Sequence, residues 1–502
     1  MPPRQHNLTE GPIGRNLLAF SLPILAGNVA QSLNGSVNAV WVGRFLGEEA
    51  LTATANANNI MFFLLGSVFG FGMAATILIA QAIGSRDITQ ARRVMGSSAT
   101  FFIGLSIAIA ALGWWLSRYL LAAMGTPAAS LQLAEDYLQV IFLAMPILYT
   151  FAFITAALRG AGDSRTPFRF LLVSVLLDIA FNPLLIFGLG PFPKLGIAGS
   201  AWSTLLAQAL TLAALLVYLR HKRHPLWLGR RDAHMFRIDL TILRALVVKG
   251  VPMGLQMVLI SLAMIAMMSM VNHYGTDTTA AYGAALQLWT YVQMPAMAIG
   301  AACSSMAAQN VGANRWDRVS ATAKAGVLFN FLLTGAIIVP LIVFDRWTLA
   351  LFLPEGSSAL EVARHLNHIS VWSFLFFGVT FVVSGVVRST GAVIPPLLIL
   401  ALALWGIRVP FANLLQPTFG PDAIWWSFPV SALCSMLLAL SYYRWGNWRR
   451  ARMLPPDPHE VAVPAEVPAT PPSPVADPSA ETDEDVAAGL ALSTAASADT
   501  KP

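Results

Sequence analysis

The chain has few charged residues, and this shortage sets its class. Asp, Glu, Lys and Arg make up 11% of its 502 residues, whereas 56% are hydrophobic and the mean hydropathy is +0.64. Soluble domains carry roughly 25% charged residues. A chain with so few charges is not a soluble globular protein. The composition predicts an all-α membrane protein with many spans.

Cysteine is nearly absent, and so are the sequence motifs of common enzymes. Cys303 and Cys434 both lie in apolar runs, where they fit as small core residues, and they form no disulfide framework or zinc spacing. The sequence contains no GxxxxGK[ST], HExxH or GxSxG pattern. These absences argue against an ATP-driven pump and against an enzyme, and they predict no cofactor and no metal site.

Long apolar runs are abundant, and each is long enough to cross a hydrocarbon core of about 30 Å as a helix. Twelve are predicted, near residues 15–39, 50–79, 97–120, 137–158, 168–190, 197–219, 243–272, 280–308, 321–344, 366–387, 393–414 and 424–445.

The basic residues report topology. The net charge is +6, yet 25 of the 31 Lys and Arg fall on one side of the predicted spans if the N-terminus is cytoplasmic. Cytoplasmic loops carry an excess of Lys and Arg. Both termini are therefore expected in the cytoplasm, and nucleic acid is not an expected partner.

The sequence repeats itself with an offset of about 228 residues. AQAIG at 80–84 matches AQNVG at 308–312, ALRGAGDSRTPF at 157–168 matches VVRSTGAVIPPL at 386–397, and Pro23 matches Pro252. Six spans return each half to its starting side, so the halves form a parallel repeat, typical of two bundles that rock about a shared cleft. The expected parts are an N-lobe at 1–220, a basic linker at 221–242 that touches lipid headgroups, a C-lobe at 243–447 and a disordered tail at 448–502.

One acidic residue lies deep in an apolar run. The chain has 25 Asp and Glu, and Asp178 alone sits near the middle of a span. A charge at that depth costs at least roughly 2.5–3.5 kcal/mol, and such residues are functional by default. Asp178 is predicted to hold a proton or a cation. The alternative is a protonated structural Asp bonded to a neighbouring helix.

Polar residues on three predicted helices could surround Asp178. Asn182 is four residues away and shares its helix face. Gln31, Asn34 and Asn38 form a polar stripe in the first span, and Thr204 lies in the sixth. If these faces meet, they form an oxygen-lined pocket for H+ or Na+. Taken singly, the neutral residues could instead be hydrogen-bonding contacts between helices.

The prolines and methionines suggest further roles. Pro23 and Pro252 interrupt the first span of each half and are predicted to bend it. Met253, Met257, Met264 and Met268 form one helical stripe and are candidates for contact with substrate, although packing and lipid contact explain them equally well. Arg408, near the outer end of the eleventh span, is predicted to snorkel toward water.

These segments resemble the multidrug and toxic compound extrusion (MATE) family over roughly residues 14–445. The resemblance rests on LPILAGNVAQSLNGSVNAVWVGRFLG, on ILIAQAIGSRDITQARRV with its counterpart MAAQNVGANRWDRV, and on RGAGDSRTPF with the stretch that follows it. It implies two six-helix bundles in a V-shaped exporter that exchanges H+ or Na+ for drugs, often cationic and amphipathic. It also implies a location in the bacterial cytoplasmic (inner) membrane, and we expect a monomer.

The family's functional residues carry over with changes. Members commonly have an Asp where this chain has Asn38, and bacterial members often have Asn then Asp four residues later, the reverse of Asp178 and Asn182 here. The Glu of another branch is missing near Ile260. With one carboxylate left, H+-coupled antiport is predicted. Na+ coupling is the alternative. A lipid-linked precursor flippase is disfavoured because the spans hold almost no interior Lys or Arg.

Overall fold

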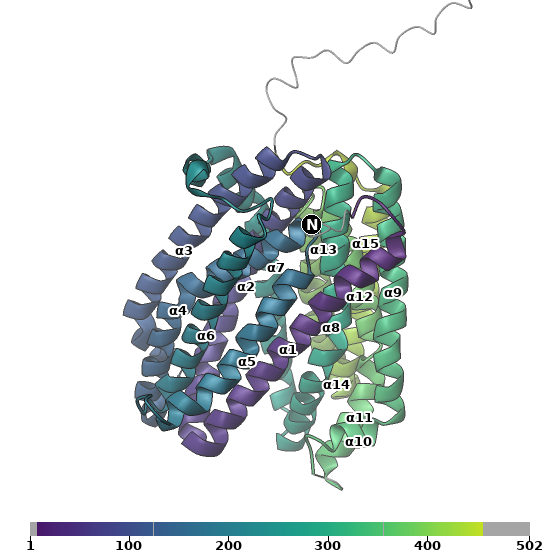
Figure 1. Cartoon of the computed structure of the whole chain (residues 1–502). Helices are drawn as coiled ribbons and strands as arrows, with labels where there is room; N and C mark the ends of the chain where they lie inside the picture. Colours follow the sequence, from purple (N-terminus) through teal and green to yellow (C-terminus); the bar gives the residue numbers. More distant parts are fainter. Residues whose placement is uncertain (1–7, 124, 355, 455–502) are drawn as a thin grey trace, which may run out of the picture. The chain divides into compact units, whose positions relative to one another are not determined.

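The computed structural model describes residues 8–123, 125–354 and 356–454, and within these ranges every regular element is helical (Figure 1). The helices of the first half are α1 (Ile13–Leu46), α2 (Glu48–Gly84), α3 (Ile88–Ala123), α4 (Ala128–Gly160), α5 (Arg165–Phe187) and α6 (Ile197–His221). The second half contains α7 (Leu240–Asn272), α8 (Thr276–Gly312), α9 (Trp316–Val343), α10 (Asp345–Leu349), α11 (Ser358–Ser370), α12 (Ser373–Arg388), α13 (Ile394–Ala401), α14 (Val409–Phe419) and α15 (Asp422–Trp445).

The twelve predicted spans are present, but two are not simple helices. The tenth is α11 followed by α12, bent by 44°. The eleventh runs from α13 through a π-helix, η2 (Leu402–Arg408), into α14. Pro410 follows the π-helix and lacks the N–H that would bond to the preceding turn, which favours an irregular turn there. The predicted all-α, twelve-helix membrane fold is confirmed.

The two halves meet through their first two helices. Among the described residues, nine helices are long and apolar enough to span a membrane alone, and the bent pair makes a tenth. The other two long helices, α2 and α8, pack against each other at the junction of the halves, and α2 also packs against α7 (Figure 1).

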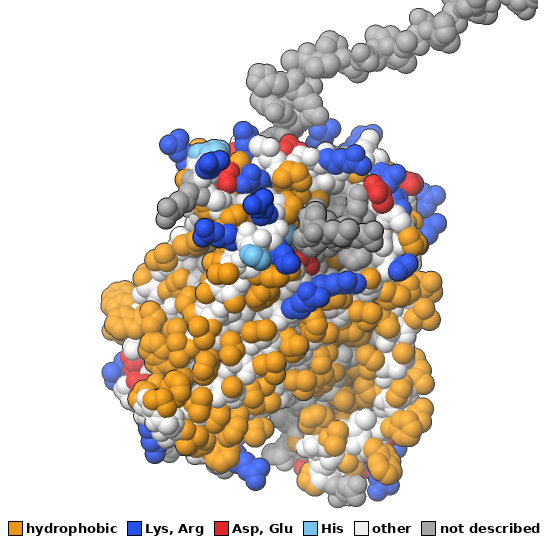
Figure 2. Space-filling model, in the orientation of Figure 1, with side chains coloured by type: hydrophobic (Ala, Val, Ile, Leu, Met, Phe, Trp, Pro, Cys, Tyr) orange, Lys and Arg blue, Asp and Glu red, His pale blue; other side chains and the backbone are white. Residues whose placement is uncertain are grey.

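Basic side chains gather at one end of the molecule, and apolar side chains cover its middle (Figure 2). The linker lies at the basic end and is ordered: it contains the short 3-10 helix η1 (Arg230–Phe236), and Asp232 pairs with Arg92 of α3 at 2.6 Å. The disordered tail was predicted to begin at residue 448, which is too early. Trp448 and Met453 are buried, so residues 448–454 belong to the folded unit, while 455–502 lie outside the described residues.

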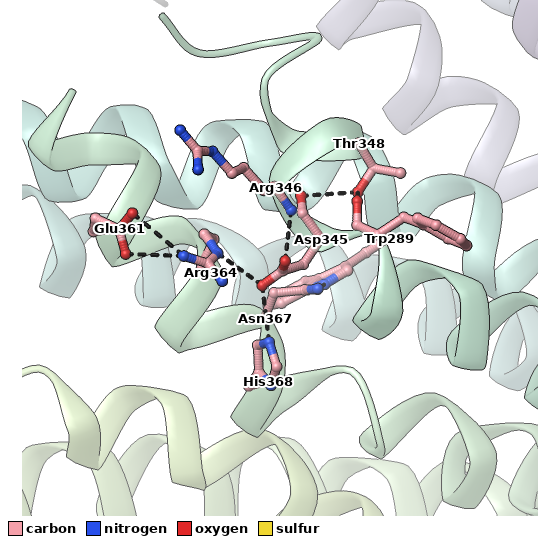
Figure 3. Close-up of polar contacts among 9 residues, drawn as sticks. Trp289, Asp345, Arg346, Thr348, Glu361, Arg364, Asn367 and His368 are labelled. Atoms are coloured by element: carbon pink, nitrogen blue, oxygen red, sulfur yellow. Dashed lines mark hydrogen bonds and ion pairs between the residues drawn. The ribbon is translucent and has the colours of Figure 1, made fainter. Parts of the chain in front are cut away.

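A charged cluster joins α10 and α11 (Figure 3), at the end of the molecule opposite the basic side chains (Figure 1). The buried Asp345 carboxylate accepts hydrogen bonds from Arg364 Nε and His368 Nε2, both at 2.9 Å, and from the backbone N–H of Arg346 at 2.6 Å. Burial raises the pKa of the Asp345 carboxyl, but these hydrogen bonds outweigh burial and hold that pKa below its usual range. The cluster therefore fixes α11 against α10 at neutral pH.

Candidate cation site and central cavity

Asp178 lies in the interior of the first half and is 3% exposed. Its oxygens accept five side-chain hydrogen bonds, from Asn34 Nδ2 (2.8 Å) and Asn38 Nδ2 (3.1 Å) to Oδ2, and from Ser203 Oγ (2.7 Å), Thr204 Oγ1 (3.3 Å) and Asn182 Nδ2 (3.4 Å) to Oδ1. The donors come from α1, α5 and α6. The structure thus brings together Asp178 and the predicted Asn34, Asn38, Asn182 and Thr204.

The geometry follows from helix spacing and close packing. Asp178 and Asn182 are one turn apart on α5, and Asn34 and Asn38 are one turn apart on α1. A glycine lets α6 approach α5, because a Cβ on Gly199 would lie 2.6 Å from the carbonyl oxygen of Leu185. This approach carries Ser203 and Thr204 to the carboxylate.

Ser203 makes the shortest of these hydrogen bonds and was not among the predicted site residues. It is fully buried, and its hydroxyl also lies 2.8 Å from the backbone oxygen of Asp178. The available signal was its position in AGSAWST, directly before Thr204. A serine among small residues in a span is common, so its type alone did not distinguish it.

Two acceptor atoms in this cluster have no partner. Asn34 Oδ1 and Asn182 Oδ1 are buried and accept no hydrogen bond from the described residues. Within the same residues, Asp178 has no Lys, Arg or His within ion-pair distance. The site is thus a carboxylate among neutral groups, with two spare amide oxygens that can accept a hydrogen bond or contact a cation.

Gln31 lies elsewhere, in a cavity between the two halves. This cavity holds about 300 Å³, a size suited to small organic ligands. Its polar lining includes Asn28, Thr76, Arg159 and Ser304, and its apolar lining includes Phe69, Met73, Phe153, Met297 and Phe381. The sequence did not show which aromatic residues faced this space, because every span contains several.

A smaller cavity of about 30 Å³ adjoins it and is lined mostly by residues of the second half. Met253 and Met257 line it with Gln256 and Arg388, and Phe69, Met73 and Phe381 are shared with the larger cavity. The other two methionines of the predicted stripe do not line either cavity: Met264 is 46% exposed, and Met268 packs against an apolar cluster in the C-terminal half.

The arginine expectations need correction. Arg408 does not snorkel: its Nε donates to Ser431 Oγ at 2.9 Å, and its guanidinium lies 4.5 Å from the centre of the Phe428 ring. Arg159 and Arg388 lie one residue beyond the predicted spans 137–158 and 366–387, yet each lines a cavity. The statement that the spans hold almost no interior Lys or Arg is therefore wrong. Burial at helix ends was not visible in the sequence.

The prolines lie inside continuous helices. Pro23 is within α1, and Pro252 is within α7. Each removes one backbone hydrogen bond from its helix, which leaves a point where bending is less costly. That either proline bends its helix stays a prediction.

The halves are tied together at the basic end by two equivalent sets of contacts. Gln81 Nε2 donates to the carbonyl oxygen of Ser389 at 2.6 Å, and Gln309 Nε2 donates to that of Gly160 at 2.9 Å. A Cβ on Gly84 would lie 1.9 Å from the Gln309 oxygen, and one on Gly312 would lie 2.0 Å from the Gln81 oxygen. We call these contacts the basic-end clasp; they hold α2 and α8 at backbone distance.

Two repeated six-span halves, a cavity between them and a carboxylate buried in one half define a secondary transporter. Comparison with known proteins agrees. The MatE family model matches residues 23–184 and 252–414, once in each half. The chain belongs to the MatE family, whose members include MATE multidrug efflux transporters.

Relatives cover most of the chain. It is 37% identical to the probable multidrug resistance protein YoeA of Bacillus subtilis, over 88% of this chain and 95% of that protein. It is 28% identical to an FAD transporter of Shewanella oneidensis, over 69% of this chain and 76% of that protein. A structure described as the outward-facing conformation of a multidrug resistance MATE family transporter superposes with a TM-score of 0.81, at 20% identity, over 88% and 98% of the two chains.

Proposed function

We propose that this protein exports amphipathic organic compounds across the cytoplasmic membrane in exchange for protons, with Asp178 as the proton site. The observation that carries the proposal is the Asp178 cluster: a buried carboxylate with five neutral donors and no basic partner among the described residues. Such a group gains or loses charge without breaking an ion pair.

The cluster provides hydrogen-bond partners for both the ionised and the protonated form of Asp178. The ionised carboxylate is stabilised by five donors, and hydrogen bonds to a charged group are each worth roughly 1.5–3 kcal/mol. The protonated carboxyl would become a donor, and the spare Oδ1 atoms of Asn34 and Asn182 are acceptors at the same site. Because Asn34 and Asn38 belong to α1, a change at Asp178 reaches the helix that contacts α8 of the other half.

Na+ is the second candidate for the same site. The carboxylate and the amide oxygens are hard ligands of the type that Na+ prefers, and the two spare oxygens suit a cation as well as a hydroxyl proton. The proton is favoured because it bonds to a single carboxylate oxygen, whereas Na+, which carries the same charge, needs several oxygen ligands.

The orientation also belongs to the proposal. The clasp closes the basic end, and the positive-inside rule makes that end cytoplasmic, so both termini would lie in the cytoplasm. The relatives named as multidrug resistance proteins support drugs as the cargo, and the FAD transporter shows that the cargo differs among relatives.

Transport in proteoliposomes tests the proposal. Rhodamine 6G export is measured with a pH gradient or a Na+ gradient imposed separately. The pH gradient alone is expected to drive export by the wild type, and Asp178→Asn, which keeps the shape of the side chain but cannot bind a proton, is expected to abolish that drive. Asp136→Asn is the control, because Asp136 is exposed at the end of a span. Full pH-driven export by Asp178→Asn would reject the role of Asp178.

A further inference from the structure

Two arginines, Arg388 buried and Arg159 partly buried, line the cavities between the halves and occupy equivalent places in the repeat. Arg159 ends α4 and lines the 300 Å³ cavity, while Arg388 ends α12 and lines the adjoining one. Each directly precedes a residue whose carbonyl oxygen takes part in the basic-end clasp, Gly160 or Ser389. Both guanidiniums therefore lie just inside the closed end.

The positive charge of these arginines is not balanced. Arg388 is 3% exposed, and among the described residues its side chain donates one hydrogen bond, from Nη1 to Gln256 Oε1 at 2.9 Å, while its Nε and Nη2 have no partner there. The Arg159 side chain makes no hydrogen bond or ion pair with the described residues, and no carboxylate among them lies within 4 Å of either guanidinium. A buried charge without a partner is costly, so its retention points to a ligand that supplies one.

The residues that line both cavities are apolar. Phe69, Met73 and Phe381 line both cavities, and the Arg388 guanidinium lies 5.4 Å from the centre of the Phe381 ring. A planar guanidinium binds carboxylate or phosphate through two parallel hydrogen bonds, and the unpartnered Nε and Nη2 of Arg388 form such a fork. An aromatic body would pack against the phenylalanines.

From this geometry we infer that the cavity binds amphipathic organic anions, with the anionic group on Arg388 and Arg159 and the apolar body against Phe69 and Phe381. The inference rests on the proposed function, since it names the substrate class of the same exporter. It extends that class beyond the cationic drugs that the family resemblance implies.

A matched pair of dyes tests the inference on the purified full-length protein. Fluorescein carries a carboxylate on a xanthene ring, and rhodamine 6G is a cationic xanthene ester. Binding of each is followed by fluorescence polarisation. Fluorescein is expected to bind the wild type, and Arg388→Gln is expected to weaken it at least tenfold without weakening rhodamine 6G. Arg388→Lys, which keeps the charge but not the fork, is expected to recover part of the affinity.

The controls separate charge from folding. Arg408→Gln removes another arginine from a span but lies outside both cavities, so fluorescein affinity is expected to stay unchanged. If Arg388→Gln does not fold, Arg159→Gln provides the test, because the Arg159 side chain is only partly buried and has no partner to lose; the same loss of fluorescein affinity is expected.

Three results would overturn the inference. The first is no fluorescein binding by the wild type, and the second is equal fluorescein affinity in the wild type and the arginine variants. The third is displacement of fluorescein by traces of phosphatidylglycerol in the micelles, which would assign the arginines to a lipid headgroup. The experiments distinguish failure of the anion-site inference from failure of the proposed export function. If a pH gradient drives rhodamine 6G but fluorescein neither binds nor moves, the anion site is wrong and the exporter stands. If the gradient drives neither dye, the exporter proposal itself fails.

Discussion

Replacement of the clasp glycines should open the basic end. The Cβ of Gly84→Ala would lie 1.9 Å from the Gln309 oxygen, and ordinary contact begins at 3.4 Å, so α2 and α8 must separate by about 1.5 Å. Overpacking of this kind typically costs 1–3 kcal/mol. A penalty of that size, applied only to the closed state, shifts its population roughly 5- to 150-fold. Gly312→Ala is expected to act equally, because its Cβ would lie 2.0 Å from the Gln81 oxygen.

Spin labels across the basic end measure this separation. Thr89 and Asp317 occupy equivalent exposed positions after the clasp, at the start of α3 and α9, and would carry the labels in a variant without the native cysteines. Both glycine variants are expected to lengthen the distance between the labels and to slow export. Gly283→Ala is the matched control on α8, since its Cβ would meet nothing within 4 Å. Distances in Gly84→Ala and Gly312→Ala that match this control would refute the reasoning.

Three further predictions concern other parts of the molecule. Exchange of the two residues in Asp178→Asn with Asn182→Asp moves the carboxylate one helical turn within the same cluster, and part of the pH-driven export lost in the single variant is expected to return. The pKa of Asp345 is lower in the folded state than in the unfolded state, so its contribution to stability is present above about pH 4, the ordinary carboxyl range, and is lost as pH falls through the folded-state pKa. Asp345→Asn should therefore reduce the fall in thermal-unfolding temperature at acid pH. Trp289→Phe leaves Asn367 Oδ1 without its 3.0 Å partner and is expected to cost roughly 1–3 kcal/mol of stability in denaturant unfolding.

The sequence predicted the fold well because membrane spans leave a strong composition signal. The number of spans follows from hydropathy, and the repeat follows from the segments that match between the two halves. Hydropathy does not report which way an apolar side chain points. The structure was therefore needed to show that Phe69 and Phe381 line the cavities. The bend between α11 and α12 and the π-helix before Pro410 also depend on local packing that hydropathy does not report.

The site was predictable where polarity was rare. Asp178 is conspicuous because no other acidic residue lies so deep, and its neighbours on α1 and α5 follow from a four-residue spacing. Ser203 was missed because serine is ordinary in membrane helices. Gln31 lines the cavity together with Asn28, whereas Asn34 and Asn38, further along the same helix, reach Asp178. Arg159 and Arg388 were misread because each is followed by loop residues, a pattern typical of exposed helix ends.

Proton release on substrate binding tests the central claim most directly. Rhodamine 6G is added to the purified protein in weakly buffered detergent solution, and the protons released per molecule are counted with a pH indicator. If Asp178 exchanges its proton for substrate, the wild type should release up to one proton and Asp178→Asn should release none, while Asp136→Asn behaves as the wild type. Equal release by Asp178→Asn and the wild type would contradict the account.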